Sequence, residues 1–66
     1  MMIELTDLNG LKVFVSPLQI CRIHEADKDA KSRGINAYVY TTDGQYIPAQ
    51  ESAFDIHAFC VAASAA

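Results

Sequence analysis

At 66 residues, the chain has the length of one small domain, and we predict a single domain over residues 1–66. A domain of this size buries only about 60% of the surface that its unfolded chain exposes, so its core needs support from a disulfide, a metal or a second subunit. Hydrophobic residues make up 52% of the chain and charged residues 20%, which indicates a folded protein. A net charge of −3 disfavours nucleic acid as a partner, and no apolar run approaches the roughly 18 residues of a membrane span.

The two cysteines, Cys21 and Cys60, can form at most one disulfide. The N-terminus lacks the basic segment and apolar run that direct a protein to export. We therefore expect reduced thiols and a cytoplasmic location.

The first turn signal along the chain is Asn9-Gly10, which lies between two alternating apolar and polar segments, residues 3–6 and 12–15. Asn-Gly supplies the positive φ angles that a two-residue type I′ turn requires. The pattern predicts a β-hairpin.

Pro17 interrupts pairing after this hairpin, and residues 20–25 are predicted to form a third strand. Strict alternation would place Cys21 and Ile23 on one face and Ile20, Arg22 and His24 on the other. The polar segment 26–36 has no hydrophobic period and contains Gly34, so we expect a mobile loop there.

A second hairpin is predicted around Asp43-Gly44, with strands at residues 37–41 and 45–49. Pro48 places the last strand at an edge of the sheet or near its own end, because proline donates no ladder hydrogen bond.

The final element is predicted to be a helix over residues 53–63, capped by the hydroxyl of Ser52, with Asp55 reaching back as in a capping box. An apolar face repeats at helical spacing through Phe54, His57, Ala58 and Val61, and Ile56, Phe59 and Cys60 extend it.

These elements define an α+β fold: a small antiparallel β-sheet or partly closed barrel of about five strands with one C-terminal helix. If the helix covers the aliphatic side, the core consists of Ile3, Leu5, Val13, Val15, Cys21, Ile23, Val39, Ile47, Phe54 and Val61. The opposite side then carries a candidate protein interface, supplemented from the helix, of Phe14, Tyr38, Tyr40, Tyr46 and Phe59. Two alternatives are ordinary exposed strand aromatics and a barrel that folds this face onto itself.

The residues that could carry chemistry are two Cys–His pairs with members three residues apart, Cys21 with His24 and His57 with Cys60. Structural zinc sites use such spacings, but residues three apart on a regular strand point to opposite faces unless a bulge intervenes. We expect no metal and no cofactor. A cysteine nucleophile would need a cleft that one small sheet and one helix do not provide, so we expect no enzymatic activity.

The segments Met2–Gly10 and Val15–Ile20, together with Asp43-Gly44 and Glu51-Ser52, resemble the FlbD-like family, also called SwrD-like swarming motility proteins. In that family a strand ends in Leu-Asn-Gly, an Asn-Pro follows, and a Glu-Ser precedes a terminal helix. Ser16-Pro17 replaces the Asn-Pro here, and the loop 26–36 is longer than the family's connection. The resemblance implies a small cytoplasmic protein of flagellar operons and carries over no catalytic residues.

The leading hypothesis is therefore a non-enzymatic interaction module that acts through self-association or by binding a protein. The alternative from another class is a small nucleic-acid-associated regulator, which would use Lys12, Arg22, Lys28, Lys31 and Arg33. The steep salt dependence of phosphate contacts would distinguish the two.

Overall fold

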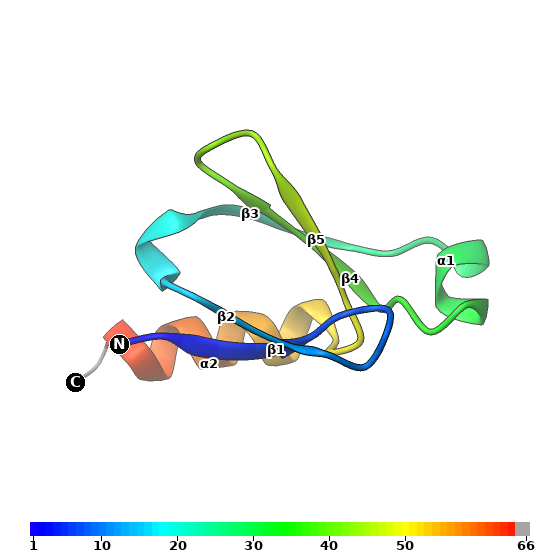
Figure 1. Cartoon of the computed structure of the whole chain (residues 1–66), viewed down its shortest axis with the longest axis horizontal. Coiled ribbons are helices and arrows are strands. Elements are labelled where there is room, and N and C mark those ends of the chain that lie inside the picture. The colour runs from blue at the N-terminus through cyan, green and yellow to red at the C-terminus, as the bar shows by residue number, and fades with distance from the viewer. Residues whose placement is uncertain (65–66) are drawn as a thin grey trace.

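A computed structural model describes residues 1–64 and shows an α+β fold (Figure 1). The elements in chain order are β1 (Ile3–Thr6), β2 (Lys12–Val15), a short 3-10 helix η1 (Pro17–Gln19), β3 (Ile20–Glu25), α1 (Lys28–Ser32), β4 (Ala37–Thr41), β5 (Tyr46–Ala49) and α2 (Ala53–Ser64). The predicted antiparallel strands and C-terminal helix are confirmed.

The strands form two antiparallel sheets, β1-β2 and β3-β4-β5, and within residues 1–64 these sheets do not close into a barrel. The sheets meet at one corner, where Asp7 forms an isolated bridge with Ala49 and the Gln50 N–H donates to the Thr6 carbonyl at 2.8 Å. The carboxylate of Glu51 accepts from the Thr6 N–H at 2.8 Å and from the Thr6 hydroxyl at 2.9 Å. Glu51 thus ties the N-terminal ribbon to the end of β5.

Both predicted hairpins exist, but the predicted type I′ turns are wrong. Gly10 has a φ of 83°, whereas Asn9, like every other non-glycine residue between 1 and 64, has a negative φ. The Gly10 N–H donates to the Asp7 carbonyl at 3.0 Å, which is the pattern of a type I turn followed by a left-handed glycine. The second turn is alike, since Gly44 has a φ of 84° and donates to Thr41 at 3.1 Å.

The predicted loop over residues 26–36 contains the short helix α1, so that prediction is wrong. Its N-cap is Asp27, whose carboxylate accepts from the Ala30 N–H at 2.8 Å. Its C-terminus is a Schellman motif, in which Ile35 N–H donates to Ala30 and Gly34 N–H to Lys31. Gly34 has the required positive φ, 91°. The buried side chains of Ala26, Ala30 and Ile35 then form a small second core against Tyr38.

A β-bulge at Cys21 corrects the predicted faces of β3. Ile20 lies opposite Thr41 and Arg22 lies opposite Tyr40, so Cys21 is the extra residue. The bulge shifts the alternation by one position. As a result Ile20, which strict alternation places on the outer face, packs on the core together with Ile23, and Cys21 is exposed.

The main core lies between the sheets and α2, and its fully buried large side chains are Leu5, Val39 and Ile56. The predicted core positions on the strands hold for Ile3, Leu5, Val15 and Val39. Ile23 and Ile47 are partly buried against them, whereas Val13 does not belong to this core cluster. The predicted helix face is wrong: Phe54 is 79% exposed and Val61 52% exposed. α2 instead turns Ala53, Ile56, Cys60 and Ala63 inward.

The Ser52 hydroxyl cap of α2 is confirmed, but within residues 1–64 the Asp55 carboxylate accepts no hydrogen bond from the Ser52 N–H, so the predicted capping box is wrong. The Asp55 N–H donates to the Ser52 hydroxyl at 3.1 Å, and the Ile56 N–H donates to the Ser52 carbonyl at 3.0 Å.

Candidate interaction surface: the tyrosine face

Three tyrosines gather on the side of the β3-β4-β5 sheet that faces away from the core. Tyr38 and Tyr40 alternate along β4 with the buried Val39 between them, and Tyr46 lies opposite Tyr40 on β5. The Tyr46 ring lies 5.9 Å from Tyr38, edge to face, and 6.0 Å from Tyr40 in a tilted arrangement. Both separations fall in the range of favourable aromatic pairs.

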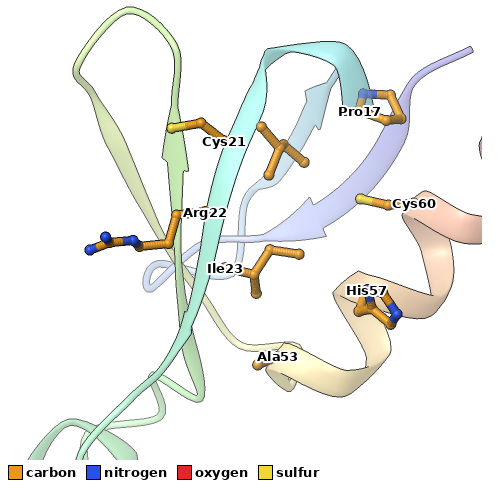
Figure 2. Close-up of a pocket in the computed structure, with 8 residues that line it drawn as sticks. Pro17, Cys21, Arg22, Ile23, Ala53, His57 and Cys60 are labelled. Atoms are coloured by element: carbon orange, nitrogen blue, oxygen red, sulfur yellow. The ribbon is translucent and has the colours of Figure 1, made fainter.

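Arg22 adds a positive charge to this cluster from the neighbouring strand. It lies opposite Tyr40, and its guanidinium carbon is 6.0 Å from the centre of the Tyr40 ring, at the limit for a cation–π contact. Figure 2 shows the Arg22 and Cys21 side chains on the side of β3 away from α2, whereas Ile23 lies toward α2. We call Arg22, Tyr38, Tyr40 and Tyr46 the tyrosine face.

The sequence alone did not place Arg22 beside a particular tyrosine, because the register of β3 against β4 depends on the bulge. Without the extra residue at Cys21, the count from Ile20 would bring a different side chain opposite Tyr40. A signal was present only for the tyrosines: Tyr38 and Tyr40 are spaced at the strand period of two, which places both on one face of the next strand.

Exposure differs among the three tyrosines. Tyr46 is 59% exposed and Tyr40 36%, while Tyr38 is half-buried because the Ala30 and Ile35 cluster beside α1 packs against it. The tyrosine nearest α1 therefore anchors the cluster, and the other two present their rings to solvent. Tyrosine is suited to such a position, since its ring is apolar and its hydroxyl can stay hydrated.

The two predicted phenylalanine interface residues do not join this face. Phe14 is on β2, in the other sheet, where it lines a hollow with Met2, Gln19 and Ile47. Phe59 lies on α2 and borders a groove with Met1 and Ile3. The five residues predicted as one interface are thus distributed over three surfaces.

The five cationic residues proposed for nucleic-acid binding are divided among three elements, β2, β3 and α1. Lys12 of β2 is 3.9 Å from the Glu4 carboxylate and donates to the Thr6 hydroxyl, and Lys31 of α1 is 3.6 Å from Glu25. Lys28 begins α1 and Arg33 caps its end. Only Arg22 belongs to the tyrosine face, so these residues do not form one tract.

Cys21 and Cys60 border one pocket between β3 and α2, but their side chains lie on opposite sides of β3 (Figure 2). Cys21 is exposed, and its thiol is 3.4 Å from the Tyr40 carbonyl. Cys60 is half-buried between α2 and β3, and burial raises the pKa of its thiol (Figure 2). Both are free thiols, and among residues 1–64 no three His, Cys, Asp or Glu side chains gather as metal ligands would.

No helix within residues 1–64 combines the length and hydropathy needed to cross a membrane. No protein-family model, curated protein or solved structure matches this chain.

Proposed function

We propose that this chain is a non-enzymatic, cytoplasmic interaction module that acts through self-association or by binding another protein, and that the tyrosine face is its recognition surface. The observation that carries the proposal is the packed group of Tyr38, Tyr40 and Tyr46 on the outer side of the sheet, with Arg22 beside it. Tyrosine and arginine are enriched among the residues that dominate binding energy in protein interfaces.

The geometry of this face keeps the entropic cost of binding low. The aromatic side chains project from paired strands, and ring-to-ring contacts at 5.9 and 6.0 Å already restrict Tyr46. Ordering a flexible side chain at an interface costs about 0.5–1.5 kcal/mol, so rings that are ordered beforehand retain more of the energy gained on burial. Full burial of one aromatic side chain contributes roughly 1.5–3 kcal/mol.

The resemblance of the N-terminal strand, the turns and the helix cap to FlbD-like and SwrD-like proteins extends the proposal to motility. In that setting the protein would act in the cytoplasm as a small accessory factor of the flagellum, through contacts rather than catalysis. The absence of a bond between Cys21 and Cys60 in the structure is compatible with that compartment.

The test compares two exposed aromatic residues on different sheets. Tyr46→Glu places a charge on the tyrosine face, and Phe14→Glu is the matched control, since the two side chains are 59% and 61% exposed. A protein captured by the wild type should also be captured by Phe14→Glu but not by Tyr46→Glu, and purified components should reproduce this difference in affinity. Equal affinity for all three chains would refute the proposal.

A nucleic-acid-associated regulator is the second candidate, and the position of Arg22 over Tyr40 favours it, because single-stranded nucleic acid stacks on aromatic platforms beside cations. The distribution of the other cations and the net charge of −3 count against it. Titration of a labelled single-stranded oligonucleotide at low and high salt decides between the candidates. Tight binding that weakens steeply with salt would favour the regulator.

A further inference from the structure

The outward side of α2 is an apolar stripe that no other element within residues 1–64 covers. Phe54, Ala58 and Val61 follow each other at spacings of four and three residues, on the side opposite the buried Ile56. This is the spacing of a seam between two packed helices. Phe54 is 79% exposed and Val61 52%, so the largest side chains of the stripe are in solvent.

We propose that a second copy of this chain covers the stripe, with the two α2 helices packed antiparallel around a two-fold axis at Ala58. The proposal concerns a surface separate from the tyrosine face and does not depend on the function assigned to that face.

The first reason is that α2 is complementary to itself. Phe54, a protruding ring, lies four residues before Ala58, and Ala62 lies four residues after it. Ala62 borders a groove of about 540 Å³ whose other lining residues include Met1, Ile3 and Phe59. A two-fold axis at Ala58 therefore brings the Phe54 ring of each copy to the groove of the other.

The second reason is the fit of this ring in the groove. A cavity of roughly 150 Å³ already holds a benzene molecule, so a groove of about 540 Å³ has room for the ring. The groove lining is mostly apolar, and its one carboxylate, on Glu4, lies 3.9 Å from the Lys12 ammonium. In Figure 1 the N-terminus lies beside the last turns of α2, which is where this groove is found.

The third reason concerns charge and close approach. Asp55 is the only acidic residue of α2, and the helix has no lysine or arginine, so two copies meet without like-charge contacts along the stripe. Ala58 at the crossing point allows the axes to approach to about 8 Å, the short end of the helix-packing range. Antiparallel helices also align their dipoles favourably.

The area available also indicates what kind of dimer to expect. Phe54 alone offers on the order of 150 Å² per copy, and Val61, Phe59 and Met1 add to it, but the helix has only 12 residues. Stable dimers bury about 1,200–2,000 Å² in total, and these side chains together offer less than that, as in weak, transient contacts. We therefore expect a reversible dimer that forms at high micromolar concentration. The tyrosine faces remain open in it, because they lie on a different surface.

Sedimentation velocity of the full chain over a concentration series tests the proposal. The wild type should convert from monomer to dimer, Phe54→Glu should raise the dissociation constant about tenfold or more, and Phe14→Glu should leave it unchanged. Circular dichroism checks that Phe54→Glu still folds. We expect it to fold, because Phe54 is exposed and its replacement leaves the core intact. A wild type that stays monomeric at about 0.5 mM, or a Phe54→Glu dimer of unchanged affinity, would overturn the proposal.

Disulfide trapping tests the geometry independently, in a chain carrying Cys21→Ser and Cys60→Ala. Ala58→Cys should cross-link rapidly, since the two Cα atoms meet at the axis within disulfide reach. Ser64→Cys, on the same helix, should not, because its two copies would be about 18 Å apart. Cross-linking through both Ala58→Cys and Ser64→Cys would mean parallel helices and would overturn the arrangement.

Two further results separate this proposal from its rivals. Tyr46→Glu should leave the dimer intact, and loss of the dimer in that variant would assign self-association to the tyrosine face instead. A monomer whose α2 binds phosphatidylcholine vesicles, with loss of binding in Phe54→Glu, would assign the stripe to a lipid surface and also overturn the dimer.

Discussion

Within residues 1–64, the tyrosine face and the outward stripe of α2 are two exposed apolar surfaces that differ in chemistry. The tyrosine face carries phenol hydroxyls and one guanidinium, and its rings contact one another. The outward stripe of α2 carries Phe54, Ala58 and Val61, which offer no polar atom beyond the backbone. Water can hydrogen-bond to the polar groups of the tyrosine face, whereas the side chains of the α2 stripe offer it only hydrocarbon.

This difference indicates how each surface is used. A face that combines aromatic rings with polar ends tolerates exposure to water, and it therefore suits transient binding of a partner. The side chains of the stripe make no hydrogen bonds with water. Their burial against a second helix is therefore favoured, to an extent that increases with the protein concentration. The two surfaces need not compete for one partner.

The largest predicted effect separates the two sides of α2. Ile56→Ala should lower the free energy of unfolding by about 2–5 kcal/mol, because Ile56 is fully buried and truncation leaves a cavity in the main core. Phe54→Ala should change it by less than about 0.5 kcal/mol at concentrations where the protein is monomeric. Urea denaturation of both variants gives these values. Equal losses would mean that the outward stripe belongs to the monomer core.

The cap of α2 is expected to have a smaller effect. Ser52→Ala removes the acceptor of the Asp55 N–H and should cost about 1 kcal/mol. The urea midpoint should fall with an unchanged slope, while Ser52→Asp, which keeps an acceptor, should restore it. An unchanged midpoint in Ser52→Ala would show that the hydroxyl contributes nothing to the helix.

The elements that the sequence predicted well are those specified by local chemistry. Strands bounded by a glycine turn, and a helix begun by Ser52, depend on residues close together in the chain. The helix α1 was missed although Asp27 and Gly34 are typical cap residues, because the helix between them has five residues and too few apolar positions to show a period. Its two caps were the signal that could have found it.

The errors over faces have a different cause. α2 is apolar around its circumference, so two stripes at helical spacing, one through Ile56 and one through Phe54, fit the same periodicity. Only tertiary packing selects between them. The bulge at Cys21 is likewise invisible to strict alternation, and it determines both the inward turn of Ile20 and the pairing of Arg22 with Tyr40.

A double-mutant cycle should detect the contacts within the tyrosine face. The coupling between Tyr40→Ala and Tyr46→Ala is expected to be about 0.5 kcal/mol, at the lower end for aromatic pairs because Tyr46 is mostly exposed. The same cycle on Phe54→Ala and Val61→Ala should give no coupling in the monomer. Urea denaturation of the single and double mutants measures both coupling energies. A coupling energy of zero between Tyr40 and Tyr46 would mean that their rings do not contact each other.

Thiol labelling of the wild-type chain probes the two sides of β3 without any substitution. Cys21, exposed at the bulge beside the tyrosine face, should react first with a disulfide reagent, and Cys60, half-buried between α2 and β3, should react second. Because burial raises the pKa of Cys60, less of it is thiolate at a given pH, and its rate should keep increasing above pH of about 8.5, the ordinary thiol value. Cys21→Ser and Cys60→Ala identify each phase. A partner bound to the tyrosine face should then slow the first phase and leave the second unchanged, whereas slowing of the second phase alone would place that partner against α2.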